Sequence, residues 1–406
     1  MLPRFAVLLP PRSPIEGLEG PLDVQTLPEG TVQLARADAL RRHKLELRAW
    51  GAVPLDAPRL LLRSDAVVSA AALAGLLAAG GPSDRALQIG GATGALLRQL
   101  AFDDALPTAA VLTDGQGDPL ERLQAARAVE LDPKERLHHF ALAPGQFDQD
   151  SLTLPISDLL ALPVRHWIQL LWANLLRLPA GLLRQISSAN PLIFLPQLLG
   201  AAWRSQSLRP LAVGGAMRRV GRGSRIHPSA VVEASWLGRG VTVGAGAVVR
   251  GCVLHDGSAV EEHGLVEGCV LAPRARVQRK AMIKFSLIGA GAMAAGYMQL
   301  GVLDNGAAFK LTSALMDQAF GGPVELNIGG QRRPAPMGLA GVCVGARTVV
   351  GAGVLVAPGR TIPPDLQIMP TPALVLRRLP SAATGRALVE DGGLRLLDPQ
   401  PAARPA

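Results

Sequence analysis

Aliphatic residues recur on a fixed rhythm between Ile226 and Ile288, and this rhythm limits the folds open to the chain. The steps rotate through six, six and five residues, so a unit of 17 residues repeats. An α-helix has a period of 3.6 and an alternating strand a period of 2, and neither gives this spacing. A coil of three short strands does, because each strand sends one large side chain inward before a tight corner. The twelve members are Ile226, Val232, Leu237, Val243, Val249, Leu254, Val260, Val266, Leu271, Val277, Ile283 and Ile288.

Small and turn-prone residues occupy the expected corners. Leu237-Gly238-Arg239-Gly240 and Val243-Gly244-Ala245-Gly246 are examples, and glycine permits the positive φ of a sharp bend. Stacked coils bury a continuous core that a single coil could not bury. The rhythm returns at Val344, Val350, Val356 and Ile362. These patterns predict a parallel β-helix from about Leu211 to about Ile368.

The repeating unit, an aliphatic residue followed by Gly and four further residues, resembles the hexapeptide repeat of the left-handed β-helix family. That family includes acyltransferases and the C-terminal halves of several sugar-phosphate nucleotidyltransferases. Within it, Ile288 to Pro363 resembles most the bifunctional nucleotidyltransferase/acetyltransferases that make UDP-N-acetylglucosamine. The matching pieces are Ile288-Gly289-Ala290-Gly291, then Asp304-Asn305-Gly306 with Lys310, then Val344 onward. The resemblance implies a left-handed coil, a homotrimer and an acyl-CoA donor such as acetyl-CoA.

Four segments follow from the patterns. Residues 1–150 are expected to form an α/β domain, with strands at Phe5–Leu9, Leu60–Arg63 and Ala110–Gly115 and helices around 38–47 and 70–77. Residues 151–205 form an apolar helical linker. The β-helix occupies 206–378, with a loop inserted at 302–338, where the rhythm is lost; loops of this length are usually functional. Residues 379–406 form a tail whose end is expected to be disordered.

The N-terminal domain resembles a degenerate nucleotidyltransferase domain. Asp65, in the run Arg63 to Ser69, is similar to the strand-end aspartate that holds magnesium in such domains, and a turn or capping role is the alternative. The family's Gly-x-Gly-Thr-Arg loop is missing from Phe5 to Pro14, so nucleotidyl transfer is not expected and magnesium is expected only if this domain is active. Gly90 to Gly94 is either a phosphate-binding turn before a helix or a plain turn.

The linker allows two interpretations. A helix is predicted from Val164 to Leu178, between Pro163 and Pro179, and it either packs between the domains or docks on a membrane surface. Tryptophan, leucine and the flanking Arg165, Arg177 and Arg184 would suit peripheral membrane contact through residues 164–203. The apolar run from Pro191 to Trp203 is about 13 residues long and too short to span a bilayer.

Composition adds limits on partners and compartment. The formal net charge is +9 over 406 residues, which favours anionic small molecules such as CoA or a nucleotide sugar, although a basic surface also serves solubility alone. No nucleic-acid partner is expected. Three cysteines, Cys252, Cys269 and Cys343, indicate no disulfide framework. Because no secretory signal is evident, we expect a cytoplasmic protein.

Acyl transfer from a CoA thioester needs a general base, most often histidine. His263 and His255 are the candidates, and acidic neighbours in the coils could orient them. The basic residues Arg279, Lys280, Lys284, Lys310, Arg332 and Arg333 are candidates for binding substrate phosphates, and solvated surface is the alternative for them.

Two functions from different classes therefore remain open. The first is an acyltransferase of sugar-nucleotide or cell-envelope precursor metabolism, which moves an acyl group from CoA to a sugar-phosphate or nucleotide-sugar acceptor. The second is a non-catalytic trimeric β-helix scaffold that binds a nucleotide sugar or a partner protein. The fold alone does not separate them, because function depends on the site.

Overall fold

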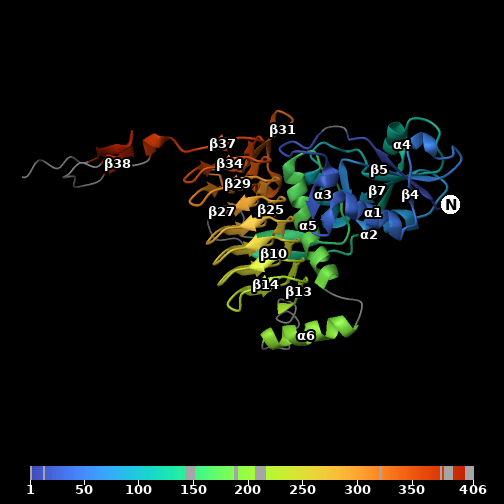
Figure 1. Cartoon of the computed structure of the whole chain (residues 1–406). Coiled ribbons are helices and arrows are strands. Elements are labelled where there is room, and N and C mark those ends of the chain that lie inside the picture. The colour runs from blue at the N-terminus through green and yellow to red at the C-terminus, as the bar shows by residue number, and fades with distance from the viewer. Residues whose placement is uncertain are drawn as a thin grey trace, which may run out of the picture.

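A computed structural model describes residues 2–11, 14–141, 151–186, 191–205, 216–319, 322–374, 377–378 and 387–397. It contains an N-terminal α/β lobe and a β-helix that lie side by side (Figure 1). The helix α5 (Trp167–Ile186) lies between them. The expected disorder of residues 398–406 lies outside the described residues.

The N-terminal lobe is built on a six-stranded sheet. Its strand order is β4-β1-β5-β8-β7-β9, and only β8 runs antiparallel to its neighbours. The strands are β1 (Phe5–Leu9), β4 (Glu46–Leu47), β5 (Arg59–Arg63), β7 (Arg85–Ile89), β8 (Ala109–Leu112) and β9 (Arg127–Leu131). The α/β class expected for this part of the chain is confirmed.

Helices cover both faces of this sheet, because alternate residues of each strand point to opposite sides. Leu60 and Leu62 pack with α1 (Val32–Arg42) and α2 (Ala70–Ala78), whereas Leu61 packs with Leu123 of α4 (Pro119–Ala125). The helix α3 (Gly91–Leu100) faces α5. The first helix starts and ends earlier than the expected range 38–47, because the side chain of Thr31 accepts a hydrogen bond from the Leu34 N–H and caps the N-terminus.

Short elements complete the lobe. Three pairs of strands are antiparallel: β2 (Thr26–Leu27) with β3 (Gly30–Thr31), β6 (Ala66–Val68) with β12 (Ala161–Pro163), and β10 (Arg136–Ala141) with β11 (Ser151–Ile156). Two 3-10 turns are η1 (Leu22–Val24) and η2 (Trp50–Ala52).

The C-terminal part is a left-handed parallel β-helix with three faces, each a parallel sheet. Face 1 contains β13 (Arg218–Val220), β16 (Ser235–Leu237), β19 (Val253–Leu254), β22 (Val270–Leu271), β25 (Leu287–Ile288), β28 (Val302–Leu303), β33 (Cys343–Val344) and β36 (Thr361–Ile362). Face 2 contains β14 (Arg225–Ile226), β17 (Thr242–Val243), β20 (Ala259–Val260), β23 (Arg276–Val277), β26 (Met293–Ala294), β29 (Ala308–Phe309), β34 (Val349–Val350) and β37 (Gln367–Ile368). Face 3 contains β15 (Val231–Glu233), β18 (Val248–Arg250), β21 (Leu265–Glu267), β24 (Met282–Lys284), β27 (Tyr297–Gln299), β30 (Ala314–Leu315) and β35 (Leu355–Val356).

The rhythm of the sequence is the core of this β-helix. Eleven of the twelve aliphatic residues are buried in one cluster inside the coils, and Ile226 packs against its end. Strand partners lie 17 residues apart, as in the pairing of Val248 with Leu265. Cys252 and Cys269 are buried free thiols within the same cluster. The structural role expected for these repeated positions is confirmed.

The coils continue further than the sequence suggested. Residues 302–315 were assigned to an inserted loop, but β28, β29 and β30 add a strand to each face. The rhythm fades because one coil is two residues shorter, so that Met282 pairs with Tyr297, and because Ala294 replaces a large aliphatic residue. The insertion runs only from about 316 to 341. It contains the antiparallel hairpin of β31 (Glu325–Ile328) and β32 (Gln331–Pro334), followed by η3 (Pro336–Gly338).

Face 1 is covered by the N-terminal lobe and α5. Trp167, Leu170 and Leu171 of α5 are fully buried in a cluster that also contains Leu27 of the lobe and Val270 of face 1. The indole Nε1 of Trp167 donates to Thr361 Oγ1 over 2.8 Å. The packing interpretation of this helix is therefore confirmed. The helix also passes the predicted end at Pro179, because Leu178 and Leu182 bury their side chains on either side of the proline.

Two further elements lie at opposite ends of the β-helix. The helix α6 (Pro191–Ser205) lies beyond the first coil, and the hairpin of β38 (Ala387–Glu390) and β39 (Gly393–Leu396) lies beyond the last (Figure 1). The short turn η4 (Pro372–Leu374) precedes that hairpin.

Candidate functional site

His255 belongs to the contact between the two parts of the protein. It follows β19 on face 1, is 9% exposed, and places its Nε2 3.1 Å from the carbonyl oxygen of Leu27. The edge of its ring packs against Trp236 at a centroid distance of 5.6 Å. Burial lowers the pKa of His255, and the hydrogen bond to Leu27 offsets only part of that effect. The neutral ring thus uses its Nε2–H to hold the N-terminal lobe on face 1.

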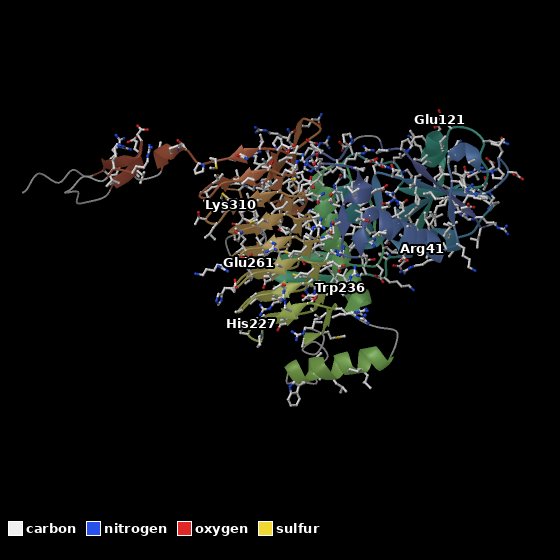
Figure 2. The ribbon with its side chains drawn as sticks, in the orientation of Figure 1. Arg41, Glu121, His227, Trp236, Glu261 and Lys310 are labelled. Atoms are coloured by element: carbon white, nitrogen blue, oxygen red, sulfur yellow. The ribbon has the colours of Figure 1, made fainter. Side chains whose placement is uncertain are left out.

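His263 lies on the opposite side of the β-helix, at the corner between face 2 and face 3. Its side chain is exposed, and its φ of 58° places the backbone in the left-handed region. Figure 2 labels the neighbouring Glu261 together with His227 and Lys310, and all three project from the side of the β-helix away from the N-terminal lobe. We name this edge, occupied by His227, Ser229, Gly246, Glu261, His263, Lys280 and Lys310 in successive coils, the outer corner.

The stacking of the coils fixes the imidazole of His263. A Cβ added to Gly246 would lie 2.6 Å from Nδ1 of His263, so the ring occupies the space that a side chain at Gly246 would take. In the preceding coil, the Gly246 N–H donates to Ser229 Oγ over 3.0 Å. The imidazole is therefore exposed to solvent and held in place by the coil before it.

The basic candidates on the β-helix differ in how far they are paired. Arg279 is 2.7 Å from a carboxylate oxygen of Glu262, and Lys284 is 3.1 Å from Glu267. Lys280, one coil after His263, is exposed and forms no ion pair with any described residue. Lys310 is likewise exposed on the outer corner. The structure thus brings His263, Lys280 and Lys310 to one edge, with Arg279 beside them.

Asp65 lies at the end of β5, as predicted, but arginines surround its carboxylate. Arg63 donates to its two oxygens over 2.8 and 2.9 Å, and Arg165 donates over 3.3 Å. Arg63 also reaches Asp104 at 2.6 Å, so these four side chains form one network. Burial would raise the pKa of Asp65, but the hydrogen bonds and charges of Arg63 and Arg165 outweigh it and lower the pKa. Two guanidinium groups balance the charge that a magnesium ion would otherwise balance.

Within the described residues, no group of three or more histidine, cysteine, aspartate or glutamate side chains has a geometry that could hold a metal ion. The glycine-rich turn at Gly90 to Gly94 is also occupied. The carboxylate of Glu135 accepts hydrogen bonds from the N–H groups of Ala92 and Thr93 over 2.8 and 2.6 Å, at the N-terminus of α3. The protein itself supplies the anion that such a helix end favours.

A cleft of about 830 Å³ lies between the N-terminal lobe and the inserted hairpin. Its lining includes α3, the segment 101–108, the start of α5, and Ile328 and Arg333 of the hairpin. Arg333, a candidate from the sequence, forms an ion pair with Asp103 across the cleft. Arg332, its neighbour, points elsewhere and is 3.8 Å from Glu325 within the hairpin. The hairpin therefore bridges to the lobe through Arg333.

The cleft contains polar groups that sequence reasoning missed. Arg98 is exposed and pairs with no acidic side chain of the described residues, and the buried hydroxyl of Thr108 has no hydrogen-bond partner among them. His166 is 1% exposed, and burial lowers its pKa to about 4 despite hydrogen bonding to the backbone of Asn327 in the hairpin. No motif marks these residues, because they converge from α3, from the end of β12 and from an insertion about 160 residues later.

Comparisons with known proteins place the β-helix in a family. Residues 220–313 match the family model described as GlmU-like, C-terminal hexapeptide. The sequence matches none of the curated proteins. The chain is similar to the acetyltransferase domain of PglB from Neisseria gonorrhoeae in complex with acetyl coenzyme A, with 18% identity, 63% of this chain and 100% of that chain covered, and a TM-score of 0.20.

Two other solved structures are similar over part of the chain. One is GDP-perosamine N-acetyl transferase from Caulobacter crescentus, with 16% identity, 60% and 82% coverage and a TM-score of 0.18. The other is UDP-N-acetylglucosamine acyltransferase from Francisella novicida, with 10% identity, 34% and 60% coverage and a TM-score of 0.13. The repeating core, the three parallel faces and the family match agree, and residues 220–313 therefore form a hexapeptide-repeat domain of the left-handed β-helix family.

Proposed function

We propose that the protein is an acyltransferase that moves an acyl group from an acyl-CoA to a hydroxyl or amine of a sugar-phosphate or nucleotide-sugar acceptor. The observation that carries the proposal is the outer corner, where an exposed histidine with a fixed ring lies beside unpaired lysines inside the family-matched segment. A non-catalytic scaffold is the competing function. Its chemistry would require none of these side chains.

In the proposed reaction, His263 acts as the general base. The acceptor oxygen or nitrogen attacks the thioester carbonyl carbon while the imidazole takes its proton. The C–S bond then breaks, and the CoA thiolate leaves with a proton. His263 is preferred to His255 because the latter is buried and its Nε2 already donates to Leu27.

The lysines of the outer corner suit the phosphates of CoA. Lys280 and Lys310 present ammonium groups without an acidic partner among the described residues, so binding an anion there breaks no existing ion pair. Arg279 and Lys284 are already paired, and we assign them to the rim. Charge-assisted contacts of this kind are about twice as strong as neutral hydrogen bonds.

The cleft supports a second role, compatible with the first, for an anionic small molecule such as a nucleotide sugar. Its volume of about 830 Å³ is within the range of small-molecule sites. Arg98 supplies a cation without an acidic partner, and Thr108 supplies a hydroxyl without one. We assign the anionic part of the ligand to Arg98 and to Arg333.

Face 3 fits the homotrimer that we propose as the assembly. Its outward row contains Val231, Met282 and Leu355, which are 38%, 40% and 70% exposed. Beside this row, Arg250 joins Glu233 and Glu267 in a ladder of ion pairs. An apolar stripe with a polar margin is typical of subunit interfaces.

The test combines calorimetry with an assay of released CoA thiol. We expect the protein to bind acetyl-CoA saturably and to lose that binding in the Lys280→Ala/Lys310→Ala double variant. With an amino-sugar nucleotide as acceptor, His263→Ala should retain acetyl-CoA binding and lower kcat by about 100-fold or more.

His227→Ala is the matched control, because His227 is an exposed histidine of the same corner. It should leave kcat within about twofold of the wild type. Silence of the wild type in both the calorimeter and the thiol assay would overturn the acyltransferase and leave the scaffold. A ligand of the cleft is tested separately with UDP-N-acetylglucosamine, and Arg98→Ala should weaken its binding while acetyl-CoA binding stays unchanged.

A further inference from the structure

The helix α6 exposes an apolar stripe. Leu195, Leu199 and Trp203 are 55%, 62% and 85% exposed, and their spacing of four residues places them on one face of the helix. Ala201, on another face, is fully buried. The helix contacts β13 of the first coil, where Val220 is also 42% exposed. An exposed tryptophan in line with two leucines is unusual on a protein surface and indicates a binding surface.

The positive charge of the chain is concentrated around this helix. Nine arginines and no acidic residue lie between Asp158 and Glu233, and they leave 32 basic residues against 32 acidic residues in the rest of the chain. The net charge of +9 therefore comes entirely from this segment. Arg165 and Arg177 pair with Asp65 and Glu29 inside the protein. The others follow in sequence around α6 and the first coil.

Three arginines of the first coil are described next to α6. Arg222 and Arg225 are exposed, and Arg218 of β13 is half-buried. Since β13 contacts α6, these cations lie at the same end of the molecule as the stripe (Figure 1). Apolar side chains and arginines without a nearby acidic residue in the sequence therefore meet at one end of the β-helix.

We propose that this end, formed by Leu195, Leu199, Trp203, Arg222 and Arg225, docks on the surface of a bilayer that contains anionic lipids. Leucine and tryptophan insert at the level of the headgroups, and arginines pair with lipid phosphates. The buried helix α5 takes no part, so the docking surface is narrower than the whole segment 164–203. None of the described helices combines the length and apolarity that crossing a bilayer requires, which agrees with attachment at the surface.

Charge favours the bilayer over a second copy of the chain. Two copies that paired through this end would bring the same arginines together, with no acidic residue between 159 and 232 to compensate them. Three large side chains on one helix also form a small contact for a stable dimer, which needs about 1,000 Å² of buried surface. An anionic surface meets both the apolar and the charged features.

Co-sedimentation of the full chain with vesicles tests the proposal without any CoA ligand, so its result is independent of the proposed acyl transfer. We expect binding to vesicles of phosphatidylcholine with phosphatidylglycerol, little binding to phosphatidylcholine alone, and weakening as salt is raised. Leu199→Asp should weaken binding about tenfold or more, whereas Leu55→Asp, at a residue 68% exposed on the N-terminal lobe, should not.

A charge-reversal pair addresses the arginines. Arg222→Glu/Arg225→Glu should weaken vesicle binding about tenfold or more, and Arg41→Glu/Arg42→Glu, with the same change of net charge on α1, should weaken it much less. Insertion is read from tryptophan fluorescence, in which a blue shift on adding anionic vesicles should vanish in Trp203→Phe.

Absence of binding to anionic vesicles at low salt would overturn the proposal, as would equal binding by Leu199→Asp and Leu55→Asp. A protein contact would appear instead as a lower molecular mass of Leu199→Asp in the absence of lipid. That outcome, with no vesicle binding, would assign the stripe to a second copy. Circular dichroism of each variant confirms that its fold is retained.

Discussion

The imidazole of His263 rests on Gly246, the residue 17 positions earlier in the preceding coil. A Cβ on Gly246 would lie 2.6 Å from Nδ1 and 2.7 Å from Cε1 of that ring. The repeat therefore determines the position of the proposed base, because each corner residue is stacked on its equivalent in the coil before it. Glycine at 246 leaves the space that the histidine occupies.

Substitution of Gly246 by alanine should displace His263 and lower acyl transfer almost as far as His263→Ala does. The φ of 62° at Gly246 adds a cost of about 1–2 kcal/mol in stability, since alanine disfavours the left-handed region. The measurement is kcat of CoA thiol release, with urea unfolding in parallel.

Gly291→Ala separates the two effects. Its φ of 66° imposes the same backbone strain, but no atom lies within 4 Å of the added Cβ. It should lose similar stability and keep its activity. Equal kcat values for the two glycine variants would show that the position of the His263 ring does not matter.

Removal of Asp65 should destabilise the N-terminal lobe strongly. Asp65→Ala leaves Arg63, which is 2% exposed, and Arg165 without their shared carboxylate, and an unpaired buried charge costs about 3–5 kcal/mol. Asp38→Ala, which breaks exposed pairs with Arg41 and Arg42, should cost about 1 kcal/mol or less. Urea unfolding gives both values. A midpoint that rises with Mg²⁺ in the wild type only would instead support the predicted metal site.

The coils were predictable because their signal is periodic. One inward side chain in every strand is a requirement of the architecture, so Val232 to Ile288 can be assigned from the sequence alone. The prediction failed where the period changed, at Ala294 and Met298, since a shorter coil moves the inward positions out of register. The likeness of the N-terminal lobe to nucleotidyltransferases stays a prediction.

The site was less predictable because residue type does not report burial. His255 and His263 are eight positions apart and equally suited to base catalysis on paper, yet one faces the N-terminal lobe and the other faces solvent. That difference depends on which face α5 covers, and the pattern of the coils is the same on all three faces. Arg98, His166 and Arg333 meet in the cleft only through the folding of the insertion.

His166 should make stability depend on pH below neutrality. Its pKa is about 4 in the folded protein and about 6.5 in an unfolded chain, so between these values the unfolded chain binds a proton that the folded chain does not. Stability therefore falls as the pH decreases from 6.5 towards 4, by up to about 1.4 kcal/mol per pH unit. Carboxylates whose folded pKa is depressed act in the same direction.

The contribution of His166 is isolated by comparing variants. The loss of unfolding free energy between pH 7 and pH 5 should be about 2 kcal/mol smaller in His166→Gln than in the wild type. His227→Gln, at an exposed histidine, should leave the loss unchanged. Identical losses in all three proteins would mean that His166 keeps an ordinary pKa.

Met282→Glu should dissociate the proposed trimer. Met282 is 40% exposed in the outward row of face 3, and its pairing with Leu265 and Tyr297 places it in the middle of that row. Three carboxylates at a closed interface would lose hydration and repel one another. Sedimentation equilibrium should give about three times the chain mass for the wild type and the single-chain mass for the variant. Met369→Glu, the same substitution at a residue 74% exposed beyond β37, should remain trimeric. A monomeric wild type would leave face 3 without its proposed partner, and a trimeric Met282→Glu would place the interface elsewhere.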